Sequence, residues 1–101
     1  MSTIQEEINK DIQAHPVILY MKGSKQMPLC GFSRKVVEIL QSLNIPFETR
    51  NVLDSEELRQ GNKEYSNWPT IPQLYIKTRF IGGCDIVTQL YETGELQKLL
   101  K

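Results

Sequence analysis

Apolar residues recur at four-residue spacing near the N-terminus, which predicts an amphipathic helix: Ile4, Ile8 and Ile12. Ser2 or Thr3 can cap the start of this helix, and Gln5 or Glu6 would complete a capping box. Since the segment carries no group suited to catalysis, we expect it to be a packing element.

A nearly unbroken apolar run over residues 16–21 predicts a strand that is buried on both faces. From Phe32 to Leu43, apolar residues recur at helical spacing and predict a second amphipathic helix. Asn44 suits the C-terminal cap of this helix, and Pro46 prevents its continuation.

The rest of the chain continues the alternation of strands and helices. In order, we expect a strand over residues 47–52; a helix that begins at residues 54–57 and is broken at Gly61-Asn62; strands over residues 73–76 and 79–81; a helix from Asp85 to Gly94; and a final helical turn ending at Leu100.

This order of elements predicts an α/β fold with one small mixed sheet and helices on both of its faces. The crossover rule makes the first two strands parallel neighbours, and the C-terminal hairpin adds an antiparallel pair. Such an arrangement of four strands is that of the thioredoxin fold. The length of 101 residues, without a repeat or a linker, indicates a single domain over residues 1–101.

Composition narrows the function classes. Twelve basic residues balance twelve acidic ones, so no global field attracts the chain to nucleic acid or to an anionic membrane. No apolar run approaches the length of a membrane span, and the N-terminus lacks the apolar core of a signal peptide. Two cysteines do not make a secreted disulfide scaffold. We expect a cytoplasmic protein.

Cys30 stands where the buried strand gives way to the second helix. Backbone N–H groups at a helix start favour negative charge, and four cations lie nearby in sequence: Lys22, Lys25, Arg34 and Lys35. A thiolate is both a nucleophile and a metal ligand, so the position supports either chemistry. The alternative is a small buried hydrophobic residue, which the polar, glycine-flanked setting disfavours.

Four stretches, in this order, resemble the monothiol, or CGFS-type, glutaredoxins: Lys22, Cys30-Gly31-Phe32-Ser33, Trp68-Pro69-Thr70-Ile71-Pro72 and Gly82-Gly83-Cys84-Asp85. The resemblance covers essentially the whole chain. It implies a thioredoxin fold, glutathione binding and a [2Fe–2S] cluster that bridges two subunits.

The resemblance also implies roles for individual residues. Lys22 and Arg59 would receive the glycyl carboxylate of glutathione, and the backbone of Ile71, before a cis Pro72, would pair with its cysteine residue. The segment Cys84-Asp85 would hold the γ-glutamyl group. Each residue also has a structural interpretation: Lys22 as a strand-end lysine, Arg59 as a solvated arginine and Asp85 as a helix cap. Taken singly, Arg59 and Asp85 favour that interpretation, but their positions beside the family motifs favour the ligand roles.

Ser33 is separated from Cys30 by two residues and occupies the position where a dithiol reductase carries its resolving cysteine. Its hydroxyl cannot resolve a mixed disulfide, so an outside thiol or Cys84 must do so. One chain cannot supply four thiolates to a cluster, and with His15 it has no convincing zinc site. Two chains and two glutathione molecules would supply four sulfurs, with Cys30 as the metal ligand of each chain.

Three functions remain open. The preferred one is binding and transfer of a [2Fe–2S] cluster to apo iron–sulfur proteins by a cluster-bridged homodimer. The second is an enzyme in which Cys30 reduces mixed disulfides with glutathione. The third is a redox-regulated adaptor for a BolA-type partner. Cys84 could contact glutathione through its backbone, act as a slow resolving thiol, or be a redox-sensitive bystander, and the first interpretation is preferred.

Two further expectations concern single residues. Trp68 is expected to pack, and His15 is expected to be a solvated link residue without a role. Two departures from the family pattern also stand out. Asn62 replaces a usually apolar residue, which predicts a looser end to the helix that carries Arg59. The turn at Lys77-Thr78 lacks the usual Asn-Gly or Asp-Gly pair.

Overall fold

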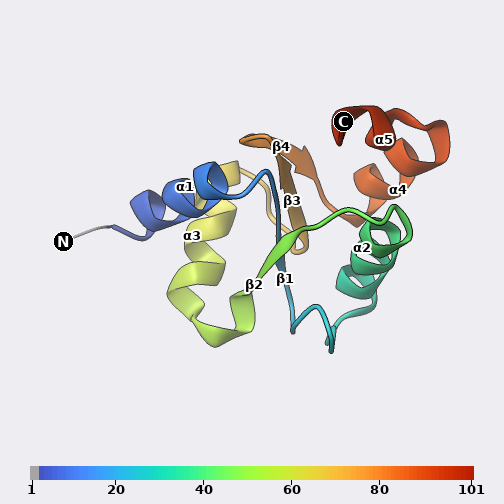
Figure 1. Ribbon diagram of the computed structural model, residues 1–101. Helices are drawn as coiled ribbons and strands as arrows, with labels where there is room; N and C mark the ends of the chain where they lie inside the picture. The colour runs from blue at the N-terminus through green and yellow to red at the C-terminus, as the bar shows by residue number, and fades with distance from the viewer. Residues whose placement is uncertain (1–2) are drawn as a thin grey trace.

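The computed structural model describes residues 3–101, which form a three-layer α/β arrangement (Figure 1). A sheet lies in the middle, with α1 and α3 on one side and α2, α4 and α5 on the other. The elements are α1 (Ile4–Ala14), β1 (Val17–Met21), α2 (Gly31–Ser42), β2 (Glu48–Asn51), the 3₁₀ turn η1 (Val52–Asp54), α3 (Glu56–Ser66), β3 (Gln73–Ile76), β4 (Arg79–Gly82), α4 (Cys84–Thr93) and α5 (Glu95–Leu99).

The four strands lie in the order β2-β1-β3-β4. The first two are parallel, and β3 runs antiparallel to both β1 and β4. The predicted thioredoxin fold, with its parallel first pair and its added hairpin, is therefore confirmed. No helix in residues 3–101 is long and apolar enough to cross a membrane.

Alternation along β1 divides the core between the two helical layers. Leu19 and Met21 join the larger cluster, which contains residues of α2, α4 and α5. Ile18 and Tyr20 join the smaller cluster, which α1 and α3 cover. All four side chains are completely buried. This explains the unbroken apolar run, since both faces of the central strand are covered.

The predicted break in the helix that carries Arg59 is wrong. α3 runs without interruption from Glu56 to Ser66 and ends at Asn67, which has the left-handed conformation common at helix ends. Gly61 is needed for contact between helices, because a Cβ there would lie 2.9 Å from Ile4 of α1. Packing against α1 therefore overrides the weak helix propensity of glycine.

Several predicted boundaries shift by a few residues. Thr3 caps α1 by accepting a hydrogen bond from the Glu6 N–H at 3.1 Å, whereas Ser2 lies outside the described residues. The helix expected at residues 54–57 begins after Ser55, and the helix expected from Asp85 begins at Cys84.

The β3–β4 turn takes a tight two-residue form without the expected glycine. Lys77 and Thr78 both have positive φ angles, 51° and 70°. Positive φ at both central residues is the pattern of a type I′ hairpin turn. The tertiary pairing of β3 with β4 therefore imposes a conformation that these two residue types do not favour.

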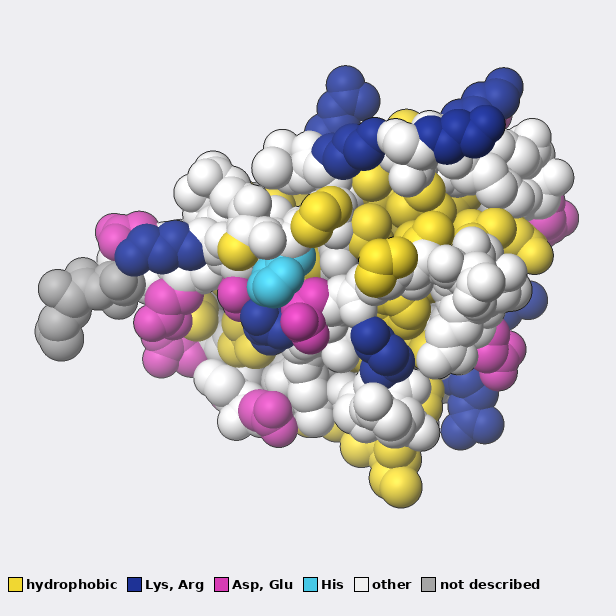
Figure 2. Space-filling view, viewed as in Figure 1, with side chains coloured by type: hydrophobic (Ala, Val, Ile, Leu, Met, Phe, Trp, Pro, Cys, Tyr) yellow, Lys and Arg dark blue, Asp and Glu magenta, His cyan; other side chains and the backbone are white. Residues whose placement is uncertain are grey.

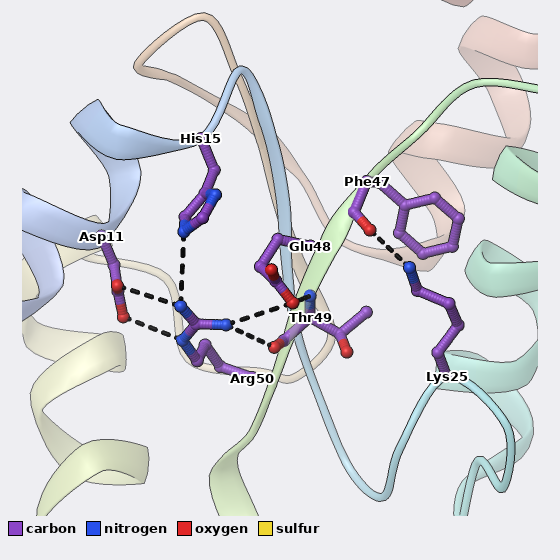
Figure 3. A network of polar contacts seen from close by, with 7 residues as sticks. All are labelled: Asp11, His15, Lys25, Phe47, Glu48, Thr49 and Arg50. Atoms are coloured by element: carbon purple, nitrogen blue, oxygen red, sulfur yellow. Dashed lines mark hydrogen bonds and ion pairs between the residues drawn. The ribbon is translucent and has the colours of Figure 1, made fainter.

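A polar network attaches the edge strand β2 to α1 (Figure 3). Arg50 contacts Asp11 through two hydrogen bonds, at 3.0 and 3.1 Å, and also lies 3.3 Å from Glu48. His15 is not simply solvated, since its Nε2 lies 3.4 Å from Arg50. Asp11 lies 39 residues before Arg50, so hydrophobic periodicity does not reveal this pairing.

Asn62 is completely buried, and neither its amide nitrogen nor its amide oxygen has a hydrogen-bond partner within residues 3–101. Since burial of an unsatisfied amide is costly, we expect Asn62→Leu to stabilise the fold by about 1–2 kcal/mol. Chemical denaturation would measure this change. Gln60→Leu, at an exposed position of the same helix, is the control and should change stability by less than about 0.5 kcal/mol. Destabilisation by Asn62→Leu would show that the amide is satisfied in solution.

Candidate functional site

The loop between β1 and α2 carries Cys30 and is fastened to the neighbouring strand β2. Asn51, at the end of β2, accepts a hydrogen bond from the Gly23 N–H at 3.0 Å. The Lys25 ammonium donates to the Phe47 carbonyl and lies 4.2 Å from the centre of the Phe47 ring (Figure 3). These contacts fix the loop relative to the sheet, and thereby fix the position of the thiol.

Cys30 is the N-cap residue of α2, as the sequence predicts for a helix start. Its side chain is half-buried and forms no disulfide. The Ser33 backbone N–H lowers the pKa of the Cys30 thiol most strongly, and the Phe32 N–H and the Lys22 ammonium act in the same direction. Partial burial opposes them. The site thus favours the thiolate, the form that attacks disulfides and binds iron.

Ser33 is completely buried and faces back toward the end of β1. Its hydroxyl accepts a hydrogen bond from the Lys22 N–H at 3.1 Å. Ser33 therefore links the end of β1 to α2, and its hydroxyl further lowers the pKa of Cys30.

A groove of about 500 Å³ opens beside the thiol. It is lined by residues from the loop before α2, from α3, from the segment before β3 and from the start of α4: Lys22, Cys30, Phe32, Arg59, Lys63, Trp68, Pro69, Thr70, Ile71, Pro72, Gly83, Cys84, Asp85 and Ile86. All six site residues singled out from the sequence are among them. The structure brings these residues together, while their roles stay predictions.

Arg59 and Lys22 place two cations along the groove, from different elements. Arg59 lies in the first half of α3, where its guanidinium is 3.6 Å from Glu56. This ion pair is partly exposed, and such pairs are weak, so an anionic ligand could compete with Glu56 for the guanidinium. The Nε of Arg59 is buried and has no partner within residues 3–101.

The segment before β3 presents free backbone groups to the groove. The Ile71–Pro72 peptide bond is cis, as the family resemblance implies. Within the described residues, the N–H and C=O of Ile71 make no hydrogen bond. An extended peptide lying in the groove could pair with both groups, in the manner of an added strand.

Cys84 and Asp85 lie in the first turn of α4 and also line the groove. Gly83, and not Asp85, is the N-cap residue, so the interpretation of Asp85 as a simple cap is wrong. The free N–H groups of this turn suit a carboxylate, and the Asp85 carboxylate suits an ammonium group. The Cys84 sulfur lies 3.9 Å from the Thr88 hydroxyl.

Sequence reasoning missed Lys63, the third cation of the groove. It lies one helical turn beyond Arg59 and would have been found by that spacing if α3 had been predicted to continue through Gly61. Trp68 combines packing with a place in the groove, since its ring lies 5.5 Å from that of Phe80.

Exposed apolar side chains flank Cys30 along the chain. Met27 is 68 % exposed, and Leu29 and Phe32 are each 62 % exposed. In Figure 2, hydrophobic side chains protrude at the lower edge, where Figure 1 places the loop between β1 and α2. Acidic and basic side chains are interspersed over the rest of this face.

Among the described residues, no three His, Cys, Asp or Glu side chains gather in a way that could hold a metal ion. The half-buried Cys30 thiolate, at an open groove, fits a centre that is shared with ligands from outside the chain.

The depressed thiol pKa is directly measurable. In a Cys84→Ser background, we expect the rate of alkylation of Cys30 to rise with pH at a midpoint below the ordinary thiol value of about 8.5. Lys22→Gln should raise this midpoint by only part of the shift, because the Ser33 N–H contributes more than Lys22. The unfolded chain in denaturant is the control. Equal midpoints for the folded and unfolded chains would contradict the assignment.

Known proteins are similar to this chain in sequence and in fold. The family model described as Glutaredoxin matches residues 17–81. A monothiol glutaredoxin of Synechocystis sp. is 56% identical over 94 residues, which span 93% of this chain and 88% of that relative. The chloroplastic monothiol glutaredoxin-S7 of Oryza sativa is 57% identical over 94 residues, which span 93% of this chain. The chain spans only 56% of the length of that rice protein.

Solved structures agree with these relatives. The solution structure of reduced apo GrxS14 from poplar is 58% identical, with a TM-score of 0.81, over 91% of this chain and 84% of that one. A buckwheat glutaredoxin–glutathione complex, 19% identical, shares the fold with a TM-score of 0.86 over 96% of this chain and 86% of that one. With Cys30 as the single cysteine at the start of α2, and Ser33 where a dithiol reductase carries its resolving cysteine, the chain belongs to the glutaredoxin family, and within it to the monothiol glutaredoxins.

Proposed function

We propose that this chain binds glutathione in the groove beside Cys30 and that two such chains share a [2Fe–2S] cluster for transfer to acceptor proteins. The observation that carries the proposal is the place of Cys30. Its thiolate is stabilised at the start of α2 and lines a groove with three cations and a helix N-terminus. The solved complex of a buckwheat glutaredoxin with glutathione supports the choice of ligand.

The groove matches the chemistry of glutathione at both ends. Its glycyl carboxylate would be bound by Lys22 and Arg59, with Lys63 as a third cation. Its cysteine residue would pair with the free backbone groups of Ile71. Its γ-glutamyl carboxylate would accept hydrogen bonds from the backbone N–H groups at the start of α4, and the Asp85 carboxylate would pair with the γ-glutamyl ammonium group.

The cluster would be held by sulfur from four sources. Each chain contributes one thiolate, Cys30, and each bound glutathione contributes another. The remaining acidic and sulfur side chains of the described residues do not add a further metal-binding group. Ser33 favours this assembly, because its hydroxyl bonds to the Lys22 N–H and cannot oxidise with Cys30 to a disulfide. The cluster is the cargo, and acceptor iron–sulfur proteins would receive it.

The second candidate is reduction of mixed disulfides, which the lowered pKa of Cys30 also favours. The Cys30 thiolate would attack the glutathionyl sulfur of a mixed disulfide and release the protein thiolate. A second glutathione thiolate would then attack the Cys30–glutathione disulfide, restoring Cys30 and forming glutathione disulfide. The third candidate is an adaptor that binds a BolA-type partner. The exposed apolar side chains near Cys30 in sequence would offer this partner a binding surface.

Anaerobic reconstitution with iron, sulfide and glutathione distinguishes the first two functions. Cluster carriage predicts a coloured species with the size of two chains, whose formation requires glutathione. S-methylglutathione, which lacks a free thiol, is the control and should give no colour. A colourless monomer with rapid glutathione-dependent disulfide reduction would contradict cluster carriage and favour the enzyme.

A further inference from the structure

Gln73 is a buried polar residue whose side chain contacts the loop that lines the groove. It is the first residue of β3, follows Pro72 directly and is completely buried. Its side-chain nitrogen donates to the carbonyl oxygens of Trp68 and Thr70, each at 3.1 Å. Both partners are carbonyls, which fixes the amide with its nitrogen toward the loop.

These two hydrogen bonds hold a loop whose backbone makes few other hydrogen bonds within residues 3–101. The Trp68 N–H bonds back to α3, to the Lys63 carbonyl and the Ser66 hydroxyl, both at 3.2 Å. From residue 69 to residue 72, no other hydrogen bond within residues 3–101 reaches the backbone. The amide of Gln73 therefore ties the groove-lining loop to the sheet.

We infer that Gln73 is a positioning residue for the glutathione groove: its amide turns the Trp68 and Thr70 carbonyls inward and so holds the Ile71 backbone where a ligand can pair with it. The inference rests on the proposed function, since it names what positions the groove for glutathione. Gln73 itself does not line the groove, so its effect on the ligand is transmitted through the loop.

The experiment compares three variants by NMR titration of the folded protein with reduced glutathione. Gln73→Met keeps the length of the side chain but removes both donors, so we expect the Kd to rise about tenfold. Tyr75→Phe is the matched control. It removes a buried hydroxyl that meets the geometric criteria for no hydrogen bond within residues 3–101, two residues along the same strand and on the same face, and should leave the Kd unchanged.

Gln73→Glu separates a positioning role from a merely structural one. When neutral, the carboxyl group donates one hydrogen bond to a loop carbonyl; when ionised, it faces two carbonyl oxygens and repels them. Burial raises the pKa of a carboxyl group at such a site. The Kd of Gln73→Glu should therefore increase, relative to that of the wild type, as the pH rises through this pKa. If Gln73 only fills space in the core, Gln73→Glu would change the free energy of unfolding but would show no pH-dependent difference in Kd from the wild type.

The outcomes are distinct. A folded Gln73→Met with the Kd of the wild type overturns the inference. If Gln73→Met does not fold, Gln73→Glu decides, and a Kd ratio to the wild type that is independent of pH overturns it. If the wild type binds no glutathione, the proposed function fails. The inference on Gln73 is then tested by its side-chain amide protons, since slow exchange of both with solvent supports the bonds to the loop and rapid exchange overturns them.

Discussion

Cys30→Ser is expected to remain colourless after anaerobic reconstitution with iron, sulfide and glutathione. A serine hydroxyl does not ionise at neutral pH and is a poor iron ligand, and no nearby group of the described residues can replace the lost thiolate. The loss of cluster should exceed the roughly 10–100-fold effect of changes to groups that only support a metal ligand. Absorbance in the visible range measures it.

The matched control is Cys84→Ser, which removes the other thiol of the same groove. The role predicted for Cys84 uses its backbone N–H, which serine also provides. This variant should therefore keep most of the colour. A colourless Cys84→Ser beside a coloured Cys30→Ser would exchange the roles of the two cysteines and contradict the site as described.

Gly23→Ala is expected to destabilise the fold by about 3 kcal/mol and to disturb the thiol loop. Gly23 has a φ of 92°, which alanine rarely adopts. A Cβ there would also lie 2.5 Å from the Met27 carbonyl oxygen and 2.6 Å from the Leu29 nitrogen, both backbone atoms of the loop that leads to Cys30. Relief of these clashes requires the loop to move.

Chemical denaturation and the alkylation profile of Cys30 would measure the two effects of Gly23→Ala. Gly31→Ala is the control for stability, because a Cβ at Gly31 would meet no described atom within 4 Å. Its position in the first turn of α2 suits alanine, so stability should hold or rise slightly. Equal stabilities of the two variants would show that the loop tolerates a side chain at residue 23.

The strand, the helix and the thiol between them could be predicted because each depends on local pattern. β1 is apolar throughout since both of its faces are covered, and α2 shows helical spacing since one face packs against the sheet. Cys30 lies between these two signals. The order of elements then leaves few topologies, and the thioredoxin fold is among them.

Features that depend on distant partners were not predictable in the same way. The intrinsic propensity of glycine predicts a helix break at Gly61. The helix continues because Ile4, 57 positions earlier, packs where a side chain at residue 61 would lie. The error at Gly61 also concealed Lys63, which a continuous helix places beside Arg59. Gln73 reads as a polar residue at a strand end, and only the course of the preceding loop shows that its amide has two partners.

Native mass spectrometry of the anaerobically reconstituted protein tests the central claim most directly, because it counts chains, glutathione, iron and sulfide in one species. The account predicts two chains, two glutathione molecules and one [2Fe–2S] cluster, and a return to monomers when the cluster is removed. A single chain carrying the iron, or a two-chain species that holds the cluster without glutathione, would contradict it.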